Sequence, residues 1–372
     1  MSTTDEKKPI IDPFGTTIIK DYNHLYEEFG IRPFRPLLTR VPNPSMYMRR
    51  NVVFGHRDFQ HILEAMNTHK DFAVMSGIKP TGEFHLGTLM TAREVIYFQS
   101  QGATAFYCIA DAEAYLDNNI SFERSQKFAV GNVADLLALG FNPKRGCIYQ
   151  QLKERRVRDL AIIFARGPTL ATMKAIYGER HVGLYYSALI QAGDILMPQL
   201  KDFGGPKPTV VPVGVDQDPH LRLTRDLAAK FRRKYNFILP SSTVHKIMKG
   251  LDGSPKMSKR NPTSYFTLHE KPEVIAKKIS NAFTGGRDTV EEQRRLGGTP
   301  ENCPVYELDM YQFVEDDDKV VQTYHDCKSG KLLCGEHKNQ TTETVLNFVK
   351  NHRRERQKFL DKAREILQNS QT

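Results

Sequence analysis

The 372-residue chain carries 53 Lys and Arg against 43 Asp and Glu, a formal net charge of +10. This length allows two domains with a sizeable core, and the charge favours a polyanionic partner such as nucleic acid. The N-terminus lacks an apolar signal segment and no run approaches the ~18 apolar residues of a membrane span, so we expect a cytoplasmic protein without membrane contact. The five cysteines form no CxxC pair, which argues against a disulfide framework and a zinc site.

Residues 1–70 are predicted to form an N-terminal extension with a Pro-rich linker, 31–50, and two helices, near 21–31 and 58–69. From 71 to 268, strands alternate with helices. The strands are predicted at 71–78, 103–112, 145–151 and 208–220, and the helices at 86–101, 121–140 and 221–235, with a largely helical stretch at 154–200. This alternation predicts an α/β domain built on a doubly wound, parallel, Rossmann-like sheet.

Residues 269–372 contain no convincing strand. Helical spacing of apolar residues recurs in four segments of this region, 271–283, 305–327, 336–350 and 353–368. We therefore expect a separate, all-helical C-terminal domain.

Three polar clusters follow predicted strands: SGIKPTGEFHLG (76–87), ADAEAY (110–115) and PVGVDQD (212–218). Ligands bind at the carboxyl ends of such strands. In the first cluster, Gly77 and Gly82 permit close backbone approach, and His85 and Gly87 mark a helix start, which attracts phosphate. A histidine at a helix start can also serve as a cap or a packing residue.

A fourth segment, SPKMSKRNP (254–262), would by itself be interpreted as a basic surface loop. Together, however, HLGT, GVDQD and KMSKR resemble, in order and context, the class I aminoacyl-tRNA synthetases with their HIGH and KMSKS motifs. FGHRD (54–58), GVDQDPHLRLTRD (214–226), NAFTGGRDTVEEQRRLGG (281–298) and FVEDDDK (313–319) are similar to tryptophanyl-tRNA synthetases of the archaeal and eukaryotic type. The resemblance extends from about residue 10 to the C-terminus.

This resemblance implies activation of tryptophan by ATP, with Mg²⁺ on the phosphates, and transfer of the acyl group to the terminal adenosine of tRNA(Trp). It implies catalytic roles for His85, Lys256 and Lys259. The implied ATP-binding residues are Gly77, Lys79, His85, Gly87, Thr88, Gly214, Asp216, Lys256, Met257, Ser258 and Lys259. No metal ion fixed by protein side chains is expected.

The resemblance also implies a tryptophan pocket, lined by Met75, Cys108, Glu113, Gln191, Asp194 and Gln217. Met75 and Cys108 depart from the eukaryotic pattern, in which a tyrosine and a glutamine contact the indole nitrogen. Asp194 matches the aspartate by which bacterial enzymes accept the indole N–H, although capping or a salt bridge is the alternative for this residue. Thr88 also departs from the family, because it replaces the second histidine of HIGH.

In the helical domain, the resemblance places Phe283, Arg287, Asp288 and Lys338 near the tRNA anticodon. The acidic segment 315–318 cannot attract phosphate, so we interpret it as structural and expect it to pair with nearby arginines. A packing or ATP-side gating role is expected for FGHRD. The family resemblance further implies a homodimer.

Three alternatives remain open at this point. A tyrosyl-tRNA synthetase has a similar body, but it places a tyrosine where Met75 stands and lacks the GGRDTVEE and EDDDK segments. A catalytically silent tRNA-binding relative is motivated by Thr88 and the altered indole-contacting positions. A small nucleotidyltransferase would lack the helical domain.

Overall fold

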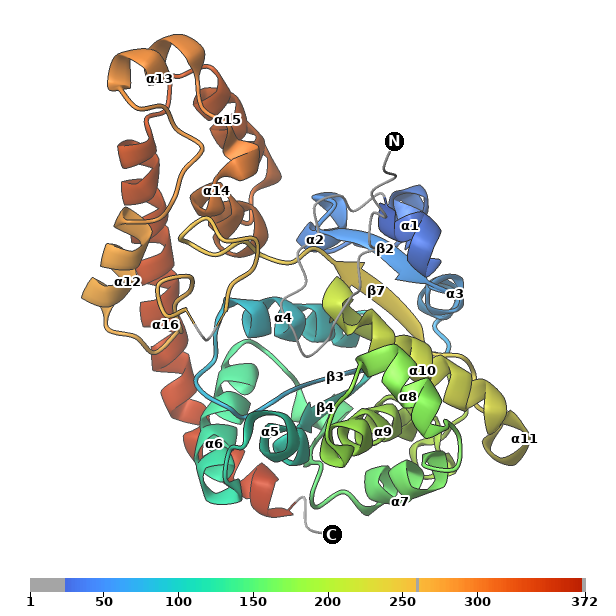
Figure 1. Cartoon of the computed structure of the whole chain (residues 1–372). Helices are drawn as coiled ribbons and strands as arrows, with labels where there is room; N and C mark the ends of the chain where they lie inside the picture. The colour runs from blue at the N-terminus through green and yellow to red at the C-terminus, as the bar shows by residue number, and fades with distance from the viewer. Residues whose placement is uncertain (1–23, 259–260, 370–372) are drawn as a thin grey trace, which may run out of the picture.

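The computed structural model describes residues 24–258 and 261–369 of the chain (Figure 1). Its centre is a seven-stranded sheet with the strand order β1-β2-β7-β6-β3-β4-β5. The strands are β1 (Arg32–Pro33), β2 (Val53–Arg57), β3 (Ala73–Ile78), β4 (Thr104–Ile109), β5 (Gly146–Gln150), β6 (Thr209–Gly214) and β7 (Ser241–His245).

Five neighbouring strands, from β7 to β5 across the sheet, run parallel, and β1 and β2 add an antiparallel edge. The four strands predicted from the sequence correspond to β3, β4, β5 and β6. Three further strands, β1, β2 and β7, were not predicted. β2 lies within the first 70 residues and pairs with β7, so part of the expected extension belongs to the sheet.

Successive residues of the central strands contribute to two separate cores. Val74, Tyr107 and Ile148 belong to one core, which includes residues of helices α4 (Leu86–Ser100) and α6 (Phe122–Ala138). Met75 and Cys108 belong to the other, with residues of α7 (Arg155–Phe164), α9 (Val182–Leu196) and α10 (Asp218–Lys230). Because side chains alternate along a strand, this arrangement is the doubly wound fold expected from the sequence.

The remaining helices before residue 259 are short. They are α1 (His24–Phe29), α2 (Met46–Arg49), α3 (Gln60–Thr68), α5 (Asp111–Asn118), α8 (Leu170–Tyr177) and α11 (Arg232–Tyr235). Within the described residues, no helix combines the length and apolar character that crossing a membrane requires.

The C-terminal region is helical and forms an arm beside the sheet (Figure 1). Its helices are α12 (Pro272–Ser280), α13 (Val290–Leu296), α14 (Pro304–Leu308), α15 (Asp317–Lys328) and α16 (Cys334–Asn369). The single helix predicted at 305–327 is wrong, because a π-helical turn, Asp309–Phe313, follows α14 and Asp316 then caps a new helix. The two helices predicted at 336–350 and 353–368 are instead one continuous helix, α16.

The FGHRD segment packs β2 against α10. Arg57 forms a two-point ion pair with Asp218, with Nε–Oδ1 and Nη2–Oδ2 distances of 2.8 and 2.9 Å. Asp58 is paired with Arg225 of the same helix, and His56 is buried. The segment therefore has the packing role that was one of its two expected roles.

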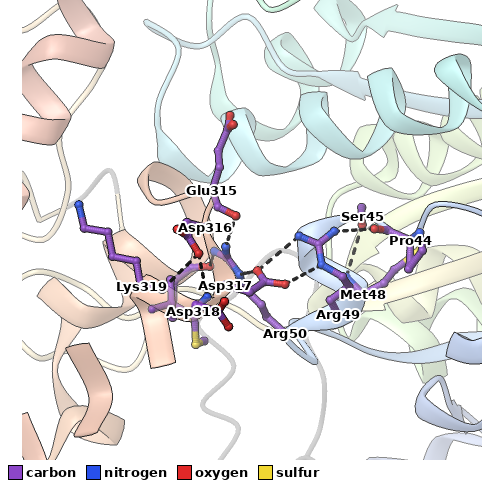
Figure 2. A network of polar contacts seen from close by, with 12 residues as sticks. Pro44, Ser45, Met48, Arg49, Arg50, Glu315, Asp316, Asp317, Asp318 and Lys319 are labelled. Carbon is purple, nitrogen blue, oxygen red and sulfur yellow. Dashed lines mark hydrogen bonds and ion pairs between the residues drawn. The ribbon is translucent and has the colours of Figure 1, made fainter. Parts of the chain in front are cut away.

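Arg49 and Arg50, from the N-terminal region, bind the acidic segment 315–318 of the arm (Figure 2). Asp317 accepts hydrogen bonds from the Nε atoms of Arg49 and Arg50, at 2.6 and 2.7 Å. Arg50 also donates to the carbonyl oxygens of Met310 and Glu315. The expected pairing with arginines is thus confirmed for Asp317, whereas Asp316 caps α15.

Removing Arg50 should destabilise the fold far more than removing Arg49. The Arg50 side chain is 6% exposed and that of Arg49 is 40% exposed. We expect Arg50→Ala to lower the free energy of unfolding by about 2 kcal/mol, because it removes a largely buried guanidinium that donates to three acceptors. Arg49→Ala should cost less than about 1 kcal/mol. Urea denaturation of both variants measures this, and equal losses would contradict it.

Candidate active site

A cavity of about 240 Å³ opens at the carboxyl ends of β3, β4 and β6. The chain continues from β3 to β4 on one side, whereas β6 lies on the other side of β3. Ligands bind at such topological switch points. All six residues expected to contact the amino acid line this cavity: Met75, Cys108, Glu113, Gln191, Asp194 and Gln217.

Asp194 is a buried carboxylate in the last turns of α9. Tyr149 donates its hydroxyl to Oδ1 at 2.8 Å, and Gln151 donates its amide to Oδ2 at 2.6 Å. Burial and the nearby charge of Glu113 raise the pKa of Asp194 to about 8. Its partners are neutral donors and it lies within the helix, so neither a helix cap nor a salt bridge explains its placement.

Tyr149 and Gln151 are site residues that the sequence interpretation missed. Tyr149 is the penultimate residue of β5, beside Cys108 of β4, and Gln151 is the first residue after that strand. Alternate strand positions share one face, so the spacing of these two side chains was the available signal. It becomes decisive only once β5 is known to neighbour β4.

Glu113 and Lys79 form the charged side of the cavity. Gln151 donates to Glu113 Oε1 at 2.7 Å, and Lys79 Nζ lies 3.6 Å from Glu113 Oε2. Lys79 is also paired with Asp117. Burial opposes the charge on Lys79, but the two carboxylates outweigh burial and raise its pKa. Gln191 Oε1 is buried and has no hydrogen-bond partner among the described residues, so it is available to a ligand.

A second cavity of about 240 Å³ adjoins the first at the start of α4. The two cavities share Gly77, Lys79 and Thr91 among their lining residues. The second is also lined by His85, Gly87 and Thr88. Backbone N–H groups at a helix start favour a bound anion, so this cavity suits the phosphates of a nucleotide.

His85 caps α4, as the alternative interpretation of this histidine allowed. Its Nδ1 accepts the Gly87 N–H at 3.1 Å, which in a neutral imidazole leaves the proton on Nε2. Nε2 lies 3.3 Å from Thr88 Oγ1. Capping therefore fixes the ring orientation and leaves the imidazole a donor at the cavity, so the cap and binding roles are compatible.

The glycines at two strand ends are required by space. A Cβ on Gly77 would lie 2.6 Å from the carbonyl oxygen of Cys108, and a Cβ on Gly214 would lie 2.7 Å from Asp216 Oδ1. Gly77 thus allows close strand packing beside the cavities.

The KMSKR segment approaches the site through Lys256. Its Nζ forms an ion pair with Asp216 Oδ2 at 2.7 Å. Met257 N–H donates a hydrogen bond to the Met248 carbonyl oxygen, and Ser258 N–H donates one to Ser264 Oγ at 3.0 Å. Lys259, the third expected catalytic residue, lies outside the described residues.

The chain after this segment returns to the HIGH-like motif. His85 and Thr267 form an isolated antiparallel bridge, and Leu268 N–H donates to the Phe84 carbonyl at 2.9 Å. Arg353 of α16 donates to the Leu268 carbonyl at 2.7 Å. Residues 267–268 therefore contact the start of α4 on one side and α16 on the other.

The residues expected at the anticodon lie on the arm, away from both cavities. Phe283, Arg287 and Asp288 are exposed. Arg287 Nε donates to the Gly297 carbonyl at 3.0 Å, and Lys338 Nζ donates to the Ser280 carbonyl at 2.7 Å.

Residues 66–350 match the family model described as tRNA synthetases class I (W and Y). This match covers more than half of the chain. The chain belongs to the class I tryptophanyl and tyrosyl tRNA synthetase family. As a member, this synthetase uses ATP, in accord with the phosphate cavity at α4.

Among curated relatives, the synthetase is 42% identical to a tryptophan–tRNA ligase of Hyperthermus butylicus, over 96% of this chain and 98% of that protein. It is 45% identical to one from Aeropyrum pernix, over 96% of each chain. The crystal structure of the tryptophanyl-tRNA synthetase from Aeropyrum pernix K1 matches with a TM-score of 0.90 and 43% identity, covering 96% of this chain and 98% of that one.

Proposed function

We propose that this synthetase is a tryptophan–tRNA ligase, which activates L-tryptophan with ATP and transfers it to tRNA(Trp). One observation carries the proposal: the buried Asp194 carboxylate, held by Tyr149 and Gln151, faces a cavity that adjoins a phosphate cavity. A single N–H in an apolar ring requires one buried acceptor, and Asp194 supplies it. The tryptophan-specific relatives support this choice over tyrosine.

In the first step, the substrate carboxylate attacks the α-phosphorus of ATP, a P–O bond forms, and the bond to pyrophosphate breaks. The substrate carboxylate is already ionised, so the step needs no general base. Catalysis comes from positioning and from neutralising charge. His85 Nε2–H and the N-terminus of α4 would hold the phosphates, and Lys256 and Lys259 would meet charge on the leaving pyrophosphate.

Asp216 is suited to accept hydrogen bonds from the ribose hydroxyls. It is paired with Lys256, so a ribose that engaged Asp216 would release Lys256 toward the phosphates. Glu113 and Gln191 would accept from the substrate ammonium, with Gln217 completing the set of acceptors.

Mg²⁺ would be bound through the phosphates and not by protein carboxylates. The lining of the phosphate cavity contains Lys79, His85 and two threonines but no carboxylate. When bound, Mg²⁺ supplies neutralisation of phosphate charge.

In the second step, a hydroxyl of the terminal adenosine attacks the acyl carbonyl and AMP leaves.

On the arm, Phe283 offers an exposed ring on which an anticodon base can stack. Arg287, Asp288 and Lys338 offer polar contacts beside it.

We also propose a homodimer in the cytoplasm. Tyr115, Phe122 and Val182 are exposed apolar residues at 46%, 45% and 80%. The rings of Tyr115 and Phe122 lie 4.8 Å apart, and α5, which carries Tyr115, packs against α9, which carries Val182. An exposed apolar patch of this kind suits a subunit interface. Light scattering on the purified chain measures the oligomeric state.

The five free cysteines suit a reducing compartment such as the cytoplasm.

The deciding experiment is ATP–pyrophosphate exchange with each of the twenty amino acids, followed by charging of tRNA(Trp). Exchange with tryptophan alone is expected. Exchange with tyrosine would assign the synthetase to the tyrosine branch, and the absence of any exchange would indicate a silent tRNA-binding relative.

The KM for tryptophan should fall as pH rises from about 7 to about 8.5, because the pKa of Asp194 is raised to about 8. The folded pKa lies above the ordinary value, so the carboxylate gains its charge across this window, and a charged acceptor binds the indole N–H more strongly. Steady-state exchange assays measure the effect. Asp194→Asn should abolish the pH dependence, and an unchanged profile in that variant would contradict the assignment.

A further inference from the structure

Three cysteines from separate segments of the arm line one small cavity. Cys303 precedes α14, Cys327 lies in the last turn of α15, and Cys334 begins α16. The cavity has a volume of about 10 Å³ and is also lined by His337. A cavity of that volume is just large enough for one water molecule or one ion.

Backbone N–H groups point at two of these sulfur atoms. The backbone groups of Gly285, Val305 and Tyr306 act on the Cys303 thiol in the direction that lowers its pKa, and that of Gly298 acts in the same way on Cys327. Such donors stabilise a thiolate more than a thiol.

His337 is oriented as a ligand would be. Its Nε2 lies 2.8 Å from Asp309 Oδ2, and Thr341 donates to the same oxygen at 3.0 Å. Both His337 and Asp309 are buried. In metal sites, a histidine typically donates one ring N–H to a carboxylate and binds the metal with the other nitrogen. Here that pairing leaves Nδ1 as the nitrogen for the cavity.

Cys334 and His337 are three residues apart in the first turn of α16, so they lie on one face of the helix. The positive end of the helix dipole favours thiolate at Cys334. Two glycines lie against the sulfur atoms, where a side chain would not fit. A Cβ on Gly286 would lie 2.7 Å from Cys334 Sγ, and one on Gly298 would lie 2.9 Å from Cys327 Sγ.

The other cluster of ligand-type side chains in the described residues is Asp135, His269 and His352. Both imidazoles donate Nε2 to the Asp135 carboxylate, at 2.8 to 3.0 Å. Arg356 Nε lies 3.1 Å from the same carboxylate. A guanidinium already neutralises this site, so it fits a junction between α6 and α16 better than a cation site.

We propose that Cys303, Cys327, Cys334 and His337 bind a thiophilic metal ion, with zinc as the natural occupant, and that Asp309 orients His337. Three thiolates and one imidazole form a closed structural zinc set, and on binding the three thiols release their protons to solvent. No three of these ligand atoms lie within 4.8 Å of one another among the described residues. Zinc would therefore draw the three segments together. This proposal departs from the sequence-based expectation of no metal site, which considered CxxC spacing alone.

The consequence for tRNA rests on the proposed function. Thr284 and Gly285, which line the cavity, adjoin Phe283, and Lys338 follows His337 directly. A metal at this point would fix the loop and the start of α16 that carry the expected anticodon contacts. It would leave the tryptophan and ATP cavities untouched.

The test is the metal content of the full chain, purified anaerobically from zinc-supplemented cells and analysed for zinc and iron by mass spectrometry. We expect about one zinc per chain, lost in Cys334→Ser and in His337→Gln. Cys147→Ser removes a cysteine of strand β5 outside the cavity and should retain zinc. Asp309→Asn should weaken zinc binding by about 10- to 100-fold. Iron with acid-labile sulfide on the same residues would support the thiolate site and change only its occupant.

A second measurement keeps the test valid if a variant folds poorly. The wild-type chain, freed of metal by a chelator, is titrated with Zn²⁺ while thiol alkylation is mapped. Zinc should protect Cys303, Cys327 and Cys334 but not Cys147. Absence of bound metal together with unprotected thiols, or equal zinc loss in Cys147→Ser, would overturn the proposal. ATP–pyrophosphate exchange, measured separately, reports on the proposed function and does not depend on these outcomes.

Discussion

His85→Ala is expected to lower kcat for ATP–pyrophosphate exchange by about 10²- to 10³-fold, the usual effect of removing one preorganised donor to developing charge. The ring is fixed by the Gly87 N–H on Nδ1, so Nε2–H is the donor lost. The tryptophan cavity does not include His85 among its lining residues, so the KM for tryptophan should change little. Steady-state exchange kinetics separate the two quantities.

His325→Ala provides a matched control, because His325 is exposed on α15. This variant should behave as the wild type. His85→Asn retains a side chain that can cap α4 but moves the donor, so it should restore thermal stability without restoring kcat. Full activity in His85→Ala would remove the histidine from the mechanism.

Above about pH 8.5, where Asp194 is ionised, Asp194→Ala is expected to raise the KM for tryptophan by about 10- to 100-fold, equivalent to losing about 1.5–3 kcal/mol for a hydrogen bond to a charged group. The change also leaves Tyr149 and Gln151 without their shared acceptor. Selectivity should relax toward other aromatic amino acids, since the indole N–H would no longer be distinguished. Exchange assays with tryptophan, tyrosine and phenylalanine measure both effects.

Tyr149→Phe tests the support of Asp194 without removing it. We expect a smaller rise in the KM for tryptophan than in Asp194→Ala, because Gln151 still holds the other oxygen. If Asp194→Ala binds tryptophan as tightly as the wild type does, another residue must accept the indole N–H.

The central strands were predictable because each is an apolar run that ends in a polar cluster, as in Ala73–Ile78. β7 was not, since its buried residues Ser241, Ser242 and Thr243 are polar and show no apolar pattern. The division of the last two predicted helices was wrong for a related reason. The polar stretch at their boundary, NHRR (351–354), consists of residues that a helix accommodates, and Arg353 donates to acceptors in the neighbouring segment.

The candidate site was predictable to the extent that its residues sit in motifs at strand and helix ends. Glu113 and His85 follow such a signal, whereas Asp194 was predicted from the family resemblance alone. Tyr149 and Gln151 could not be found in this way, because their role depends on which strand lies beside β4. The convergence of Cys303, Cys327 and Cys334 was also hidden, since turns and helices between them set their distance and sequence spacing does not.

The bridge between His85 and Thr267, with Arg353 behind it, sets the order in which a growing polypeptide can become active. The phosphate cavity begins near the first third of the chain, yet the segment that braces it is made much later, and the arginine that braces that segment is made near the end. A nascent chain on the ribosome therefore holds an unfinished nucleotide site until α16 has emerged. Fragments ending before residue 353 lack this brace.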